Sequence, residues 1–146
     1  MKVVDVNILL CAVNRDSPCH AAAKSWLERA LCGDEPMAFP WVVILGFLRI
    51  STSPRIFPHP LDARHALGVV DSWLSQPSVM ALNPGEEHWR LLRGLLDEAG
   101  TVGNLTTDAH LAAVAIEHGA ELNSTDSDFA RFARLRWANP LQAWVE

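Results

Sequence analysis

Apolar positions along the chain fall into two alternating patterns. Short runs rich in β-branched or aliphatic residues are typical of buried strands, and longer stripes with apolar residues three or four positions apart are typical of helices with one buried face. The short runs predict strands at residues 2–5, 37–39, 79–82 and 120–124. The stripes predict helices that start near Asn7, run from Ser17 to Gly33, from Pro40 to Ser53, around 66–74, from Pro84 to Gly100 and from Thr106 to Gly119.

The segment 41–51 is the most apolar of these stretches. It is apolar almost all round, as in a helix buried on every side, and the serine–proline step at 53–54 would end it. Its β-branched content leaves a strand as the alternative. Trp26, Trp73 and Trp89 lie on the inward stripes of their helices, which favours core packing for these rings.

Strands that alternate with helices are typical of a layered α/β fold with a mainly parallel central sheet. The 146 residues are enough for one sizeable core and too few for two ordinary domains, so a single domain over residues 1–146 is expected. In such sheets, ligands bind outside the carboxyl ends of the strands. Candidate chemistry is therefore sought at the strand ends.

Composition and charge narrow the function classes. With 49% hydrophobic and 20% charged residues, a disordered or fibrous chain is excluded. The 12 Lys and Arg residues against 17 Asp and Glu residues give a formal charge of −5, so a general attraction to nucleic acid or to an anionic membrane is not supported. Because no apolar run approaches the roughly 18 residues of a membrane span, we expect a cytoplasmic protein without membrane association.

The cysteines indicate neither a disulfide framework nor a zinc site. Cys11, Cys19 and Cys32 are odd in number and lack the spacing of paired metal ligands. We expect them to be small buried apolar side chains in a reducing compartment.

Carboxylates follow two of the predicted strands and start one helix. Asp5 closes the first strand, Asp126 and Asp128 follow the last one, and Asp108 lies in the first turn of the helix that a threonine is expected to cap. If these acids share one rim, they repel one another unless a cation such as Mg²⁺ or Mn²⁺ neutralises them. Each acid alone also has a structural explanation, as a helix cap, a partner of the helix dipole or an Asx turn.

The order of these motifs resembles a known family. The segment DVNILL that begins at Asp5, TTDAHLAAVA from Thr106 and STDSDFARF from Ser124 resemble the acidic motifs of PIN-domain ribonucleases, specifically the VapC-like toxins of type II toxin–antitoxin systems. The segment PWVVILGFLRI from Pro40 and NPL from Asn139 resemble the mycobacterial-type branch. The resemblance spans nearly the whole chain.

This resemblance implies a PIN-like three-layer α/β/α fold and a metal-dependent endoribonuclease. It implies cleavage of RNA phosphodiester bonds, with 5′-phosphate and 3′-hydroxyl ends on the products, by acids that hold Mg²⁺ or Mn²⁺. It also implies a homodimer and a cognate VapB-like antitoxin that offers an arginine to the acids. By position, the catalytic metal-binding acids are Asp5, Asp108 and Asp126, with Asp128 as a further metal-binding acid and with Asn7 and Thr125 in support.

One position departs from the family pattern. Many PIN proteins carry a glutamate in the helix after the second strand, where this chain has Gly46, and no Asp or Glu occurs from Pro36 through Leu61. This gap favours one metal held by three or four acids. It also supports the alternative of a catalytically weak or silent PIN scaffold that binds RNA or antitoxin.

The acidic net charge means that RNA binding relies on local cations. Surface arginines also serve solubility, which is the alternative for each of them. His110 is interpreted as structural, with proton shuttling as its alternative. The candidate cations form two groups, Arg131, Arg134 and Arg136 near the end of the chain, and Arg49 and Arg55 near its middle.

A second enzyme class also places acids at strand ends. Receiver domains and dehalogenase-like phosphatases do so on similar sheets, but these families need a lysine late in the chain. Only Lys2 and Lys24 are present here, and Asp-x-Asn stands where such a phosphatase has Asp-x-Asp. Phosphotransfer is therefore disfavoured.

Overall fold

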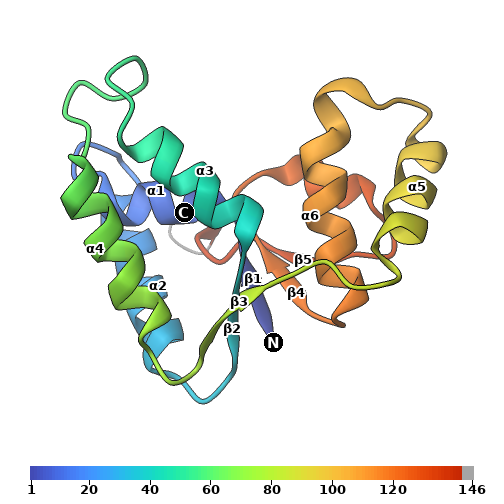
Figure 1. Cartoon of the computed structure of the whole chain (residues 1–146), viewed down its shortest axis with the longest axis horizontal. Coiled ribbons are helices and arrows are strands. Elements are labelled where there is room, and N and C mark those ends of the chain that lie inside the picture. Colours follow the sequence, from blue (N-terminus) through green and yellow to red (C-terminus); the bar gives the residue numbers. More distant parts are fainter. Residues whose placement is uncertain (143–146) are drawn as a thin grey trace.

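Five strands form one entirely parallel sheet in the order β3-β2-β1-β4-β5 in the computed structural model, which describes residues 1–142 (Figure 1). Parallel pairing of consecutive strands requires long crossover connections, which are usually helical and contain α-helices here except between the last two strands. The α/β prediction is confirmed. The strands are β1 (Lys2–Val4), β2 (Met37–Pro40), β3 (Val79–Leu82), β4 (Glu121–Asn123) and β5 (Arg136–Ala138).

Six α-helices flank the sheet in the described part of the chain, with α1 to α4 on one side of Figure 1 and α5 and α6 on the other. Contacts join α1 to α2 and α3, α3 to α4, and α5 to α6. No helix within residues 1–142 is long and apolar enough to cross a membrane. The helices are α1 (Val6–Val13), α2 (His20–Cys32), α3 (Trp41–Ser51), α4 (Ala63–Leu74), α5 (His88–Ala99) and α6 (Thr106–Glu117), with short 3₁₀ turns η1 (Gly103–Leu105) and η2 (Ser127–Arg131).

The central strand β1 sets the register of the sheet. Val3 lies opposite Ala38 of β2 on one side and opposite Leu122 of β4 on the other. The next residue after the strand, Asp5, donates its backbone N–H to the carbonyl of Asn123 over 3.0 Å. The carboxyl ends of β1 and β4 therefore lie side by side, and the residues that follow them are neighbours.

The core confirms two of the three tryptophan predictions. Trp73 is 7% exposed, and its ring lies 5.7 Å from that of Phe39 and 4.9 Å from that of Phe47. Trp26 is 8% exposed. The segment 41–51 is a helix, so the strand alternative was wrong.

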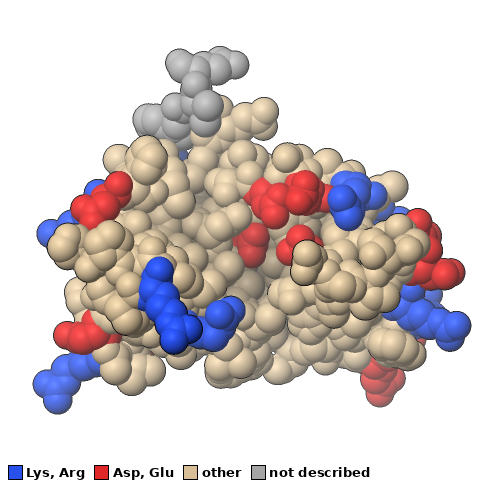
Figure 2. All heavy atoms as spheres, turned by 90° about the horizontal axis from the view of Figure 1, so that it is seen from above, with Lys and Arg blue, Asp and Glu red and all other residues tan. Residues whose placement is uncertain are grey.

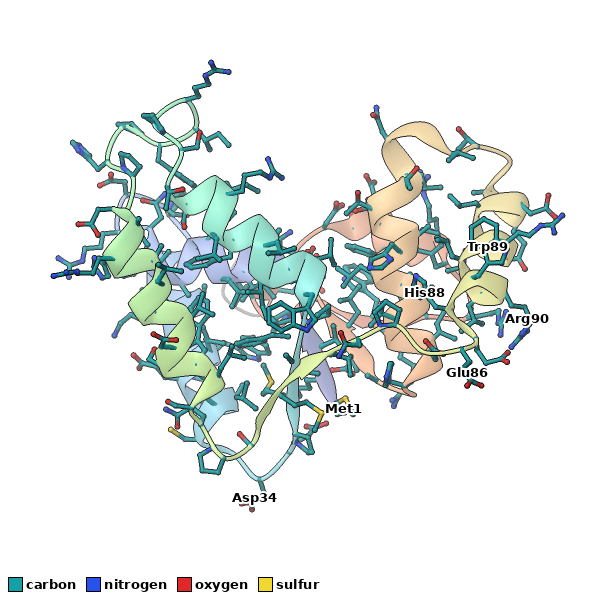
Figure 3. All side chains as sticks on the ribbon, in the orientation of Figure 1. Met1, Asp34, Glu86, His88, Trp89 and Arg90 are labelled. Atoms are coloured by element: carbon teal, nitrogen blue, oxygen red, sulfur yellow. A yellow bond between two sulfur atoms is a disulfide. The ribbon has the colours of Figure 1, made fainter. Side chains whose placement is uncertain are left out.

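Trp89 is not in the core, because α5 turns a different face to the core than its sequence pattern indicates. The helix begins at His88, and its buried residues are Leu91 and Leu95. Trp89 precedes Leu91 by two positions, which is about 200° around a helix, and it is 67% exposed (Figure 3). The residues before α5 are held outside the helix by Glu117 of α6. Its carboxylate accepts the backbone N–H groups of Gly85 and Glu87, at 2.7 and 2.9 Å.

Other boundaries also differ from the sequence prediction. Ser17 lies in a turn, and α2 begins three residues later. α6 begins at Thr106 without a threonine cap, because the Thr106 hydroxyl donates to the Gly103 carbonyl over 2.7 Å. The strand β5 was missed, since its three residues in an arginine-rich stretch carry no strand pattern.

The expectation of three reduced, buried cysteines was wrong. Cys11 at the end of α1 and Cys19 at the start of α2 form a disulfide, with Cα atoms 5.8 Å apart. The turn between the two helices brings these residues together, which the spacing of eight residues does not reveal. Cys32 is free and exposed.

Candidate active site

Asp5 occupies the point where β1 turns into α1. One carboxylate oxygen accepts the N–H of Val6 over 2.7 Å, which makes Asp5 the N-cap of α1. The other accepts the hydroxyl proton of Ser124 over 2.6 Å. Burial raises the pKa of Asp5; the bonds from Ser124 and Val6 lower it, and the nearby charge of Asp126 raises it further. Asp5 is thus a buried acid that both caps a helix and lacks a cationic partner among the described residues.

Ser124 links the acids that follow the two central strands. It is completely buried, and its hydroxyl oxygen accepts the N–H of Asp126 over 3.0 Å while its proton goes to Asp5. The side-chain amide of Asn7 also donates to this oxygen, over 3.4 Å. The sequence predicts a supporting role for the neighbouring Thr125, which is partly exposed and makes no side-chain hydrogen bond within residues 1–142. The signal in the sequence, a small hydroxyl residue just after β4, is shared by Ser124 and Thr125 and does not distinguish them.

Asp108 faces the same group of acids from α6. Burial raises its pKa, and the charges of Asp126, Asp5 and Asp128 raise it further, in that order. Only the charge of Arg131 lowers it. Since charges act strongly only over short distances in solvent, Asp108 lies within electrostatic reach of the other three acids. Acidic side chains gather near the centre of the face in Figure 2.

Asp126 and Asp128 lie in the turn after β4. Asp126 accepts the N–H of Asp128 over 2.9 Å and so caps η2. The structural explanations offered by the sequence therefore hold for Asp5 and Asp126. These capping roles are compatible with a role in the group of acids, because a carboxylate that caps a helix or turn still repels the carboxylates near it.

The donor set fits a hard divalent cation. Within residues 1–142, no three Asp, Glu, His or Cys side chains already converge on one metal-sized point. Mg²⁺ usually keeps several waters and uses one or two protein carboxylates, so it does not require such a closed set. Burial, and after it the neighbouring carboxylates, raise the pKa values of Asp5 and Asp108, and a cation would offset both effects. Asn7 adds a buried Oδ1 without a hydrogen-bond partner in the described chain.

Comparisons with known proteins agree with these motifs. The PIN domain family matches residues 2–135. Ribonuclease VapC37 of Mycobacterium tuberculosis (strain ATCC 25618 / H37Rv) is 45% identical over 140 residues, which cover 96% of this chain and 97% of that protein. The chain belongs to the PIN-domain family of VapC ribonucleases.

Solved structures show the same fold. One is VapBC2 from Rickettsia felis, bound to a DNA fragment from its promoter, with a TM-score of 0.70 at 20% identity. The match covers 94% of this chain and 97% of the VapBC2 chain. A toxin–antitoxin complex from Klebsiella pneumoniae has a TM-score of 0.63 at 18% identity and covers 96% and 98% of the two chains. These likenesses establish that the VapC-family chain has the PIN fold.

The residue that departs from the family pattern lies beside the N-terminal turn of α1. A Cβ atom added to Gly46 would approach the Val6 side chain to 3.6 Å, an ordinary contact. α3 therefore has room for a side chain at this position, next to the residue that follows Asp5. Crowding therefore does not explain why this position lacks the glutamate.

The predicted RNA-binding arginines do not form one group. Arg131 is the one whose charge acts on the acids, through Asp108. Arg49 at the end of α3, Arg55 in the following loop and Arg134 before β5 are exposed, with no such link. Arg136 is engaged elsewhere, because its guanidinium donates to the carbonyl of Gly119.

His110 contacts His88 of α5. Its Nδ1 lies 2.9 Å from Nε2 of His88, and the rings pack edge to face with centres 4.6 Å apart. Burial and the neighbouring His88 lower the pKa of His110. This contact joins α5 to α6 and supports the structural interpretation of His110.

Proposed function

We propose that this VapC-family chain is a metal-dependent endoribonuclease toxin that hydrolyses RNA phosphodiester bonds with Mg²⁺ or Mn²⁺. The observation that carries the proposal is the buried Asp5, bridged by Ser124 to the backbone of Asp126 and within electrostatic reach of Asp108 on α6. Ionised acids so placed are costly in a protein without a cation. The name of the 45% identical relative, a ribonuclease, supports the same activity.

Each side chain then has a defined task. Asp5, Asp108 and Asp126 hold the cation, and Asp128 assists them directly or through water. Asn7 Oδ1 accepts a proton of water in the site, and Thr125 orients a carboxylate or a water with its hydroxyl. The cation supplies Lewis-acid polarisation of a phosphate oxygen and a lower pKa for water.

RNA reaches the site through local cations. Arg131 stands beside the acids and is placed to contact a phosphate next to the cleaved bond, while Arg49, Arg55 and Arg134 contact phosphates farther along. Hydrolysis leaves a 5′-phosphate and a 3′-hydroxyl. The catalytically silent scaffold stays the alternative function, because Gly46 removes one acid from the family pattern.

We infer two protein partners. A VapB-like antitoxin is supported by the structural likeness to a toxin–antitoxin complex, and an arginine from it would pair with the acids. A homodimer is supported by the exposed apolar face of α3, where Trp41 and Leu45 lie one turn apart and are 44% and 59% exposed.

A cleavage assay tests the activity. Purified chain incubated with a mixed RNA pool and Mg²⁺ or Mn²⁺ is expected to give fragments with 5′-phosphate ends, and a chelator is expected to abolish them. The 5′-phosphate is detected by a phosphate-dependent exonuclease. Cleavage that survives the chelator would contradict the metal dependence, and no cleavage across many RNAs would favour the scaffold.

Gly46→Glu is expected to strengthen metal binding. The added carboxylate joins an already negative group of acids, and we expect the Kd for Mn²⁺ to fall about tenfold, which corresponds to roughly 1.4 kcal/mol. Titration calorimetry measures this. Gly46→Gln is the matched control, because it adds the same bulk and the same helix propensity without the charge, and equal affinities of the two variants would contradict the prediction.

A further inference from the structure

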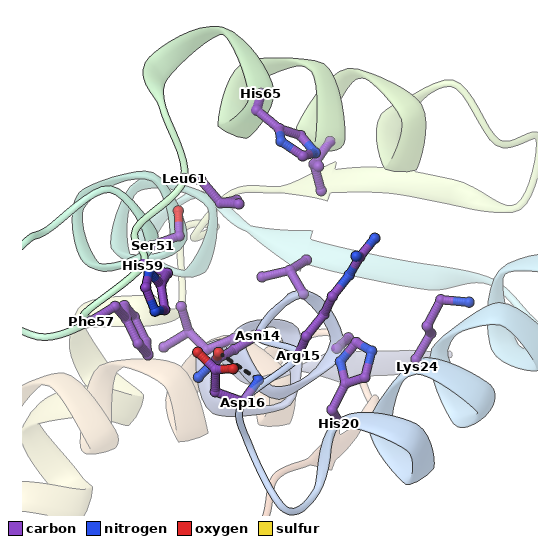
Figure 4. A pocket seen from close by; sticks show the side chains of 14 residues that line it. Asn14, Arg15, Asp16, His20, Lys24, Ser51, Phe57, His59, Leu61 and His65 are labelled. Carbon is purple, nitrogen blue, oxygen red and sulfur yellow. Dashed lines mark hydrogen bonds between the residues drawn. The ribbon is translucent and has the colours of Figure 1, made fainter.

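A cavity lies at the opposite end of α1 from Asp5. It has a volume of about 560 Å³ and is lined by the end of α1, the start of α2, the end of α3, the α3–α4 loop and α4 (Figure 4). This size lies within the usual range of small-molecule sites. None of the four acids of the candidate active site lines it.

The walls of this cavity combine aliphatic and ring side chains. Leu10 and Val69 contribute aliphatic surface, from α1 and α4. Phe57, His59 and His65 bring three rings from the α3–α4 loop and from the first turn of α4. Flat rings of this kind stack on nucleobases without regard to sequence.

Cations outnumber acids around the cavity. Arg15 and Lys24 line it, and Asp16 is the one acid that does so among the described residues. Arg15 extends from the α1–α2 turn between His20 and His65, with Lys24 beside them (Figure 4). The Cys11–Cys19 disulfide closes this turn, which limits the movement of Arg15. Lys24 also pairs with Glu28 over 2.8 Å, whereas Arg15 makes no ion pair within residues 1–142. The charge of Arg15 therefore suits an anion.

A buried hydroxyl at the end of α3 lacks a partner. Ser51 is 3% exposed and lines the cavity, and its Oγ makes no hydrogen bond within residues 1–142. A buried polar atom without a partner is costly and uncommon. A polar group of a bound molecule would satisfy it.

We propose that this cavity binds a nucleoside monophosphate. The base stacks among Phe57, His59 and His65, the phosphate pairs with Arg15 and Lys24, and the Ser51 hydroxyl bonds a polar atom of the base or ribose. The nucleotide is either free or part of an RNA chain. If the nucleotide is part of an RNA chain, the inference rests on the proposed function. The eight residues of α1 separate the cavity from Asp5 by only about 12 Å along the helix axis, so one RNA chain spans both places.

Calorimetric titration of the four nucleoside monophosphates into the full chain, in chelator, tests the site. We expect saturable binding with a Kd below about 1 mM, about tenfold weaker binding by Arg15→Gln, and a similar loss for nucleosides that lack the phosphate. Ser51→Ala is expected to weaken binding as well. Arg93→Gln, an exposed arginine on α5 away from the cavity, is the matched control.

Two results would overturn the proposal: no saturation by any of the four nucleotides, or equal affinities of the wild type, Arg15→Gln and Arg93→Gln chains. Thermal melting confirms that the variants fold. Binding that persists in Asp5→Asn assigns it to this cavity and not to the acids; binding that this variant loses overturns the proposal.

The source of the nucleotide is tested with single-stranded RNA and the Asp5→Asn chain. If RNA supplies the nucleotide, adding Arg15→Gln weakens RNA binding about as much as it weakens monophosphate binding. If RNA affinity is unchanged, the cavity takes the free nucleotide. Nucleotide binding without RNA cleavage would refute the proposed function alone, and cleavage without nucleotide binding would refute this inference alone.

Discussion

Asp5→Asn is expected to lower RNA cleavage by roughly a thousandfold or more, which corresponds to about 4 kcal/mol of transition-state stabilisation. The carboxamide keeps an acceptor for the Val6 N–H, so the cap of α1 is retained. It removes one negative ligand from the group of acids, and the cation binds more weakly. The rate is measured on a labelled RNA under single-turnover conditions with Mg²⁺ or Mn²⁺.

The same variant is expected to fold as stably as the wild type, or more stably, when no metal is present. Burial raises the pKa of Asp5, so the unfolded chain releases this proton at a lower pH than the folded chain does. Ionisation of Asp5 therefore lowers the free energy of unfolding. This loss of stability is complete above the raised pKa of the folded chain and absent below the ordinary pKa of 3.8. The stability advantage of Asp5→Asn exists at neutral pH and disappears on acidification.

Melting curves at several pH values, with and without metal, test both parts. We expect the metal to raise the Tm of the wild type and to leave that of Asp5→Asn nearly unchanged. Asp71→Asn, which changes an exposed acid on α4, serves as the control and is expected to cleave normally. Wild-type turnover by Asp5→Asn would exclude Asp5 as a metal ligand.

Ser124→Ala is expected to reduce cleavage by about ten- to a hundredfold, the usual effect of removing a group that orients a metal ligand. The hydroxyl donates to Asp5 and accepts the N–H of Asp126, so its loss frees both acids from their common anchor. It also removes a bond that lowers the pKa of Asp5. The acidic limb of the pH–rate profile is therefore expected to move to higher pH, which a merely structural serine would not cause.

Thr125→Ala is the natural comparison for this variant. Thr125 follows Ser124 directly but is partly exposed and makes no side-chain hydrogen bond within the described part of the chain. We expect a smaller loss of activity and no shift of the pH profile. If Thr125→Ala loses more activity than Ser124→Ala, Thr125 and not Ser124 makes the larger orienting contribution.

Much of the architecture was predictable because local patterns agreed with the fold. Apolar runs marked four of the five strands, and the alternation with helices predicted a parallel sheet, which in turn predicted that acids after β1 and β4 lie at one edge. Gly100, with φ of 71°, ended α5 where a left-handed residue was needed. These features depend on neighbours in the sequence and on a general rule of parallel sheets.

Contacts between distant segments were not predictable in this way. Glu117 on α6 holds Gly85 outside α5, and the burial of Leu91 and Leu95 leaves Trp89 at the surface, although the stripe of apolar residues includes that ring. The disulfide between Cys11 and Cys19 depends on the path of a turn. Each requires knowledge of which surfaces meet in space.

The candidate site shows the same division. The acids could be named from their order along the chain, because their residue type and their place after strands indicate a cation site. Ser124 could not be distinguished from Thr125, since adjacent residues at the end of a strand point in opposite directions and only packing decides which one turns inward. Burial then determines the electrostatics, because it raises the pKa of Asp5 and Asp108 only after folding has removed them from water and placed their charges together.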